Sequence, residues 1–204
     1  EADILIGTQM IVKGHDFPDV TLVGVLAADL SLHVGDYRAA ERTFQLLTQA
    51  AGRAGRGNKP GEVVIQTYDP EHYSIETAKA QDYDGFYEQE IAYRKIMLYP
   101  PVWNMLVILC ASKSEEAADA MAAELAAAAD AYTGKNTKEK VYLVGPVDAA
   151  IAKVNDIYKK IIYLKAENYD TLVKIKNRTE VYARESRYYK NVTVMFDFNP
   201  VNGF

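Results

Sequence analysis

The chain has 204 residues, 49% of them hydrophobic and 25% charged, with a formal net charge of −5. This composition is typical of a globular protein with one large or two small domains, and it excludes a disordered or fibrous chain. The single cysteine, Cys110, excludes a disulfide framework or a cysteine zinc site within this chain, and its apolar neighbours favour a buried, inert thiol.

The first 100 residues predict an α/β arrangement. Three short apolar runs have the length of strands: 4–6, 20–28 and 62–68. A helix-like stretch from about 38 to 56 separates the last two runs, so we expect a parallel sheet whose strands are covered on both faces. A charged stretch from 74 to 98 predicts one or two further helices. Because the chain starts at Glu1 and enters an apolar run at once, we expect a piece of a longer protein.

Pro100-Pro101 marks the predicted boundary between a domain at 1–100 and a domain at 101–204, because proline ends helices. The second domain predicts a strand, a helix, two strands, a helix and a strand, at 105–111, 115–132, 141–144, 157–165, 169–181 and 192–198. This βαββαβ order favours an α+β ferredoxin-like domain. No apolar run reaches the roughly 18 residues of a membrane span and no leader opens the chain, so we expect a cytoplasmic protein that does not bind membranes.

Residues 49–56, the arginine segment, read Gln-Ala-Ala-Gly-Arg-Ala-Gly-Arg. Gln49, Gly52 and Arg56 are spaced by three and four residues, which places them on one face of a helix with Arg53 beside them. Glycine inside a helix costs about 1 kcal/mol relative to alanine, so Gly52 and Gly55 favour low bulk beside the arginines. Forked, permanently charged guanidinium groups suit a phosphoryl group. An exposed helix with solvated arginines is the alternative, but the length of the pattern favours phosphate contact.

Residues 7–18 follow the first apolar run directly, where parallel sheets bind ligands. Thr8 and Gln9 have side chains that hydrogen-bond nucleic-acid phosphates, and Asp16 has one that accepts from a ribose hydroxyl or orients the arginines. The tetrapeptide Lys13-Gly14-His15-Asp16, taken alone, is a weak motif that is better explained as a polar turn with a solvated lysine.

Together, residues 7–16 and 49–56 resemble motifs V and VI of the superfamily 2 helicases. Further stretches resemble the primosomal protein N′ (PriA) family of bacterial replication-restart helicases: 7–10, 13–23, 53–57, 60–63, 66–67, 99–101, 145–147 and 197–200. The resemblance covers essentially the whole chain. It implies that residues 1–100 are the C-terminal part of a RecA-like helicase lobe 2, and that a C-terminal domain follows.

The resemblance also implies roles for site residues. Arg56 is the expected arginine finger, Arg53 a second phosphate contact, and Gln49 a group that positions the nucleotide or its water. Gly14, Asp16, Gly52 and Gly55 are expected to contact the nucleotide. Thr8, Gln9 and Lys13 are expected to contact DNA. ATP and Mg²⁺ belong to the full-length protein and zinc to a segment upstream of motif V. No phosphate loop or acidic metal-binding box occurs in this chain, so we expect it neither to bind a cofactor nor to hydrolyse ATP alone.

Residues 151–190 contain 10 Lys/Arg and 5 Asp/Glu, interleaved with tyrosines. This mixture suits a surface that binds phosphates and stacks bases. The candidate DNA contacts are Lys159, Lys160, Lys174, Lys176, Arg184 and Arg187. A solvated basic face with core tyrosines explains the pattern about as well. The family resemblance implies forked or single-stranded DNA, single-strand DNA-binding protein and other primosome proteins as partners.

Two other functions stay open at this point. The chain is either a DNA- or protein-binding module without a motor, or part of a superfamily 2 translocase from another DNA-processing system. The upstream sequence distinguishes them, since a phosphate loop, an acidic box and a cysteine cluster together indicate the restart helicase.

Overall fold

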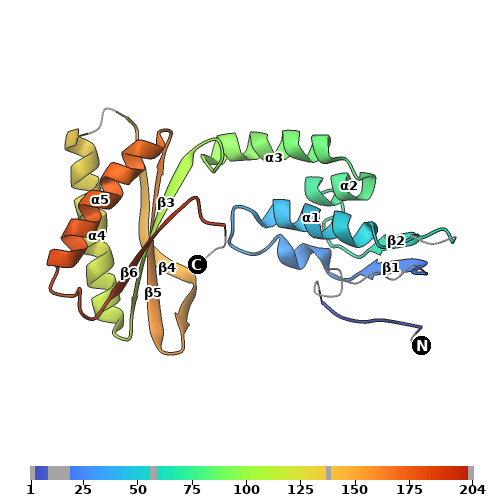
Figure 1. Cartoon of the computed structure of the whole chain (residues 1–204), viewed down its shortest axis with the longest axis horizontal. Helices are drawn as coiled ribbons and strands as arrows, with labels where there is room; N and C mark the ends of the chain where they lie inside the picture. The colour runs from blue at the N-terminus through green and yellow to red at the C-terminus, as the bar shows by residue number, and fades with distance from the viewer. Residues whose placement is uncertain (1–2, 9–18, 56–58, 137–138, 202–204) are drawn as a thin grey trace. The chain divides into compact units, whose positions relative to one another are not determined.

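The computed structural model describes residues 3–8, 19–55, 59–136 and 139–201, which form two compact units divided between Ala92 and Tyr93 (Figure 1). The division comes earlier than the predicted boundary at Pro100-Pro101. The reason is local, because Arg94 Nη1 donates to the carbonyl of Pro100 at 2.8 Å and Lys165 Nζ donates to that of Met97 at 2.9 Å. These bonds make the residues before the prolines part of the second unit.

The first unit holds a two-stranded parallel sheet, and its elements are β1 (Leu22–Val25), η2 (Ala28–Ser31), α1 (Ala39–Ala51), β2 (Glu62–Ile65), α2 (Tyr73–Ala80) and α3 (Tyr83–Met97), whose end enters the second unit. Figure 1 shows α1 lying along the sheet that it connects. The core includes Phe44, Leu47 and Ile75, and the rings of Phe44 and Phe86 stack at 4.3 Å. The α/β prediction, its parallel pairing and its two trailing helices are confirmed.

The predicted strand at 4–6 is wrong, because these residues have irregular backbone and Ile4 and Ile6 are 79% and 88% exposed. A strand needs a hydrogen-bonded neighbour, and the described part of the chain pairs none with this segment. The helix predicted from 38 to 56 is also too long, since α1 ends at Ala51.

The second unit follows the predicted βαββαβ order. Its elements are β3 (Asn104–Ser112), α4 (Glu115–Asn136), β4 (Tyr142–Val154), β5 (Ile157–Ala166), α5 (Tyr169–Glu185) and β6 (Thr193–Phe198). The strands form one antiparallel sheet in the order β4-β5-β3-β6. Thus β3-α4-β4 joins two parallel strands around β5, and β5-α5-β6 joins two parallel strands around β3. Two interlocked βαβ units result.

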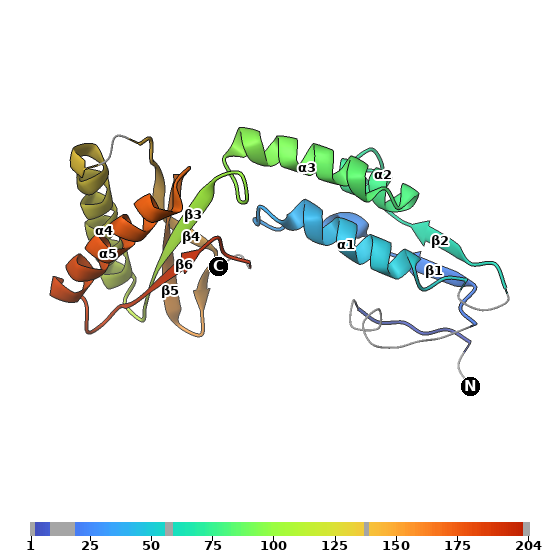
Figure 2. The ribbon, with the colours of Figure 1, turned by 45° about the horizontal axis from the view of Figure 1, so that its top comes forward.

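Helices α4 and α5 lie side by side on one face of this sheet (Figures 1 and 2). Their apolar stripes and the facing strand residues make the core, whose fully buried members include Leu106, Ile108, Met121, Leu125, Ile162, Leu164, Leu172 and Ile175. The strand predicted at 192–198 is confirmed as β6, and Val192, Val194, Phe196 and Phe198 are part of this core or pack against it. Cys110 is buried there, and its burial raises the pKa of the thiol to about 12. None of the helices in the described ranges combines the length and apolar character needed to cross a bilayer.

Candidate functional site

The arginine segment begins on the last turn of α1 and continues as a tight turn. The N–H of Gly52 donates to the carbonyl of Thr48 at 3.0 Å, and Arg53 and Ala54 then make shorter-range bonds to Ala50 and Ala51. Gly55 has φ 71°, the left-handed conformation that ends helices and favours glycine. The one-face prediction therefore fails beyond Ala51, because the two glycines end the helix instead of reducing bulk along it. Arg56 lies outside the described residues.

Two backbone contacts fix this turn to the amino ends of the parallel strands. The N–H of Gly55 donates to the carbonyl of Val20 at 3.0 Å, just before β1. Gly61, just before β2, lies so close that an added Cβ would be 2.2 Å from Gly55 N and 2.4 Å from the carbonyl carbon of Ala54. Only glycine allows this approach, so Gly61 fixes the position of the backbone next to Arg53 relative to the sheet.

The structure brings four predicted residues together at this turn and leaves the others apart or outside the described ranges. Gln49 is exposed on the last turn of α1, Arg53 is half-buried with its Nε buried, and Gly52 and Gly55 shape the turn. Thr8 is exposed in the irregular segment 3–8. The remaining loop candidates, Gln9, Lys13, Gly14 and Asp16, lie outside the described residues.

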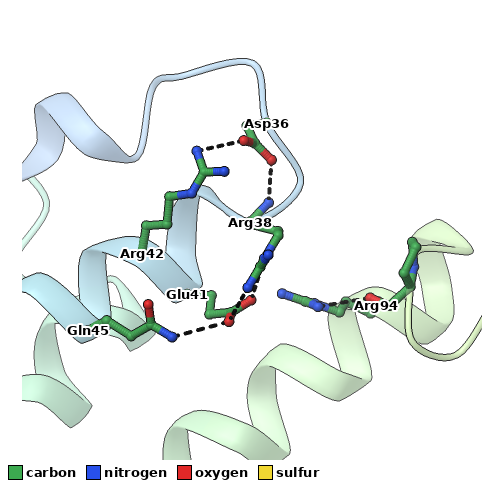
Figure 3. A network of polar contacts seen from close by, with 7 residues as sticks. Asp36, Arg38, Glu41, Arg42, Gln45 and Arg94 are labelled. Atoms are coloured by element: carbon green, nitrogen blue, oxygen red, sulfur yellow. Dashed lines mark hydrogen bonds and ion pairs between the residues drawn. The ribbon is translucent and has the colours of Figure 1, made fainter. Parts of the chain in front are cut away.

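The opposite end of α1 is held by a polar network that sequence reasoning missed (Figure 3). Asp36, whose side chain is 3% exposed, accepts from the backbone N–H of Arg38 at 2.9 Å and pairs with Arg42 at 2.7 Å. Arg38 makes a two-pronged contact with Glu41, with distances of 3.0 and 2.8 Å, and this hydrogen bonding raises the pKa of the guanidinium. Gln45 donates to Glu41 as well, at 3.2 Å. The position of Asp36 just before a predicted helix start was the available signal.

Asp29 joins the loops that follow β1 and β2, and it was missed too. Its buried carboxylate accepts from the Thr67 hydroxyl and from the backbone N–H groups of residues 68 and 69, the latter two at 2.8 and 3.2 Å. These bonds, first that of Thr67, lower the pKa of Asp29. On the same loop, the hydroxyls of Ser31 and Thr43 are 2.7 Å apart, which connects the loop to α1. A lone acid directly after a strand-like run was the signal.

The basic candidates of the second unit do not form one charged surface. Lys160, with its side chain 12% exposed, makes ion pairs with Asp119 at 2.8 Å, Asp148 at 2.7 Å and Glu115 at 4.0 Å. The hydrogen bonds from Asp119 and Asp148 raise the pKa of this lysine. Its charge is therefore balanced by acids of helix α4 and strand β4.

Glu180 balances two more candidates, because it pairs with Lys176 at 2.6 Å and with Arg184 at 2.8 Å. The first of these contacts lowers the pKa of Glu180 most. Lys174 and Arg187 are exposed, and Arg187 lies 4.6 Å from the centre of the Tyr188 ring. Lys159 is half-buried on β5, next to Lys160 in the strand and thus on the opposite face. Contact of these six residues with DNA stays a prediction.

Within the described ranges, no group of three or more His, Cys, Asp or Glu side chains is arranged to hold a metal ion.

Comparison with known proteins relates both units to one family. Residues 95–201 match the family model described as "Primosomal protein N C-terminal domain". The chain is 45% identical over 201 residues to the replication restart protein PriA of Bacillus subtilis (strain 168), which covers 98% of this chain and 24% of that protein. It is 40% identical over 175 residues to the PriA of Synechocystis sp., covering 86% and 20%, and 36% identical over 200 residues to that of Treponema pallidum, covering 98% and 29%. The chain therefore spans less than a third of the length of these relatives.

Proposed function

The chain belongs to the primosomal protein N family, and from this we propose that it is the C-terminal part of an ATP-dependent DNA helicase that acts in replication restart and primosome assembly. The observation that carries the proposal is the family match combined with the arginine segment fixed at the end of α1. The names of the relatives favour replication restart over another superfamily 2 system.

In this proposal the arginine segment is one half of an ATP site. Arg56 is the arginine finger, Arg53 a second phosphate contact, and Gln49 positions the nucleotide or its attacking water. The backbone contacts of Gly55 and Gly61 support it, because a finger works only when its start is held in place. ATP with its Mg²⁺ supplies the phosphoryl group to be cleaved, and the groups that hold them, like the family's zinc, are assigned to other segments of the longer protein.

The remaining contacts follow the family pattern. The loop residues Thr8, Gln9 and Lys13 contact the DNA backbone, Gly14 and Asp16 face the nucleotide, and Thr8 transmits between the two. The second unit is a ferredoxin-like domain that binds DNA, single-strand DNA-binding protein and other primosome proteins; its two interlocked βαβ units support the fold assignment. A protein that acts on bacterial DNA works in the cytoplasm.

The test measures DNA-stimulated ATP hydrolysis in the longer protein that contains this chain. We expect Arg56→Ala to lower kcat by about a thousandfold or more, because an arginine finger stabilises charge in the transition state. KM for ATP and affinity for forked DNA should change little, since the finger contributes mainly after binding. Arg53→Ala should lower kcat less and raise KM.

Arg178→Gln is the matched control, because Arg178 is an exposed arginine of α5 outside the arginine segment. Its ATPase should equal that of the unaltered protein. Equal loss of ATPase and DNA binding in Arg56→Ala would contradict the finger assignment, and a longer protein without any ATPase would favour the module without a motor.

A further inference from the structure

Three aromatic side chains and two lysines meet on the second unit and form what we name the aromatic–lysine surface: Tyr99, Trp103, Tyr142, Lys140 and Lys165. The rings of Trp103 and Tyr142 meet edge to face, with centres 5.6 Å apart. Lys140 Nζ lies 4.6 Å from the centre of the Tyr142 ring, and Lys165 Nζ lies 3.8 Å from that of Tyr99. No predicted DNA contact is among these five residues.

The fold builds this surface from one loop and two strands. Trp103 donates its backbone N–H to the carbonyl of Tyr99 at 3.2 Å, so a single turn holds both rings. Tyr142 of β4 is the register partner of Lys165 of β5, which makes their side chains neighbours on one face. The neighbouring register pair consists of Leu143, which follows Tyr142, and Leu164, which precedes Lys165. Both leucines pack into the core beneath the helices. The surface therefore lies on the sheet face opposite α4 and α5.

The two lysines of this surface differ from Lys160 in having no carboxylate partner among the described residues. Lys160 has three acids around it, whereas neither Lys140 nor Lys165 makes an ion pair with any described carboxylate. Glu139, beside Lys140, instead accepts from the start of α5, at Asn168 N and Thr171 Oγ1. Lys165 gives one hydrogen to the Met97 carbonyl, and burial lowers its pKa. A bound anion would supply the charge partner that both ammonium groups lack.

The rings are half-buried, so packing holds them while part of each stays open to solvent. Fixed aromatic rings beside lysines without a carboxylate partner suit single strands, because unpaired bases stack on rings and their phosphates contact ammonium groups. We propose that the aromatic–lysine surface is a binding platform for single-stranded nucleic acid, with bases stacked on Trp103 and Tyr142 and phosphates on Lys140 and Lys165. The inference extends the DNA binding that the proposed function assigns to this unit.

Trp103 is the only tryptophan of the chain, so its emission reports this surface directly. We expect an oligothymidylate of about 16 nucleotides to quench that emission at fixed salt when added to the 204-residue chain. Tyr142→Leu should weaken binding about tenfold and Tyr142→Phe should retain it, because phenylalanine keeps the stacking face and leucine does not. Binding without quenching, or equal affinity for the leucine and phenylalanine variants, overturns the proposal.

The lysines are tested by Lys140→Gln and Lys165→Gln, with Lys113→Gln as the matched control. Lys113 is an exposed lysine just after β3, and Lys140 is exposed, so neither substitution removes a packing contact of the core. Each of the first two should weaken binding and lower the slope of log K against log salt by about 0.7, while the control changes neither. An unchanged slope in both variants overturns the phosphate contacts.

An acidic peptide of matching charge is the second probe. If the peptide quenches Trp103 and the oligothymidylate does not, the surface binds an acidic protein segment and the proposal is wrong. Both experiments use the chain without ATP. A negative result therefore leaves the ATPase test of the arginine segment untouched, and loss of that ATPase leaves the platform untouched.

Discussion

Replacing Gly61 by alanine tests whether backbone contact sets the position of the arginine segment. The added Cβ would lie 2.2 Å from Gly55 N and 2.4 Å from the carbonyl carbon of Ala54, whereas ordinary van der Waals contact begins at 3.4 Å. The backbone at one of the two sites must then move by roughly 1 Å, and such overpacking costs about 1–3 kcal/mol of unfolding free energy. In the longer protein, misplacing the arginines by about 1 Å should lower kcat for ATP hydrolysis by about 100-fold.

Gly52→Ala is the matched control on the same segment. A Cβ at Gly52 meets only the Thr48 and Gln49 carbonyl oxygens, at 3.5 and 3.7 Å, and the φ of −66° suits alanine. This variant should be as stable as the unaltered chain or more stable by up to about 1 kcal/mol. Hydrogen exchange should show faster exchange of the Gly55 and Glu62 amides in Gly61→Ala alone, with the Trp103 unfolding transition of the second unit unchanged. Equal amide exchange and equal unfolding free energy in both variants would refute the reasoning.

Three further predictions follow from single residues. Asp29→Asn should destabilise the first unit most at neutral pH. The folded pKa of Asp29 is lowered, so its contribution to the unfolding free energy is present above pH 3.8 and is lost as the pH falls further. Urea unfolding at several pH values should show the stability difference between the two proteins closing below pH 3.8. Lys160→Met should lower the unfolding free energy by about 1 kcal/mol at neutral pH, because the carboxylates paired with Lys160 are more than half exposed. The folded pKa of Lys160 is raised above 10.5, so the difference between the two proteins should shrink only above that pH, and a constant difference to high pH would exclude the ion pairs as its cause. Cys110, with a pKa of about 12 from burial, should react with a thiol reagent at neutral pH only as fast as the unit unfolds.

The second unit was predictable because every strand finds its partner within the chain. Burial on one face imposes an apolar periodicity on α4 and β6, and the helix and strand predicted at 115–132 and 192–198 are present. Strand β4 was predicted to end at Val144, directly before Gly145-Pro146. It continues to Val154, because those two residues lie at a register irregularity of an edge strand, where proline is tolerated.

The first unit was less predictable, because its sheet is small and its polar contacts are long-range. The apolar run at 4–6 carries a strand signal, but a strand signal without a pairing neighbour leaves the residues exposed. The sequence spacing of Gln49, Gly52 and Arg56 is that of one helix face, but α1 ends at Ala51, and Gly55 has the left-handed conformation that follows a helix end. Asp29 receives its hydrogen bonds from residues 67–69, which no local pattern connects to it.

Long-range contacts also explain why the charge count misjudged the basic residues. A count over 151–190 gives an excess of positive charge, but Glu115, Asp119 and Asp148, which lie outside that window, surround Lys160. Conversely, Lys140 and Trp103 lie outside the window, so the count gave no signal for the aromatic–lysine surface. Charge counted along a chain differs from charge on a surface wherever acids from other elements fold onto the bases.

Salt dependence separates binding at the aromatic–lysine surface from binding at the six basic candidates. Binding through the aromatic–lysine surface neutralises two phosphates, and at about 0.7 per phosphate for single strands the slope of log K against log salt should be about −1.4. Binding through all six basic candidates would give a slope near −4 by the same relation. Because three of those six are already paired with carboxylates, we expect the shallow slope. An oligothymidylate titration of the 204-residue chain at several salt concentrations measures the slope, and a slope near −4 would show that the charge of the six basic candidates, not stacking, carries the binding.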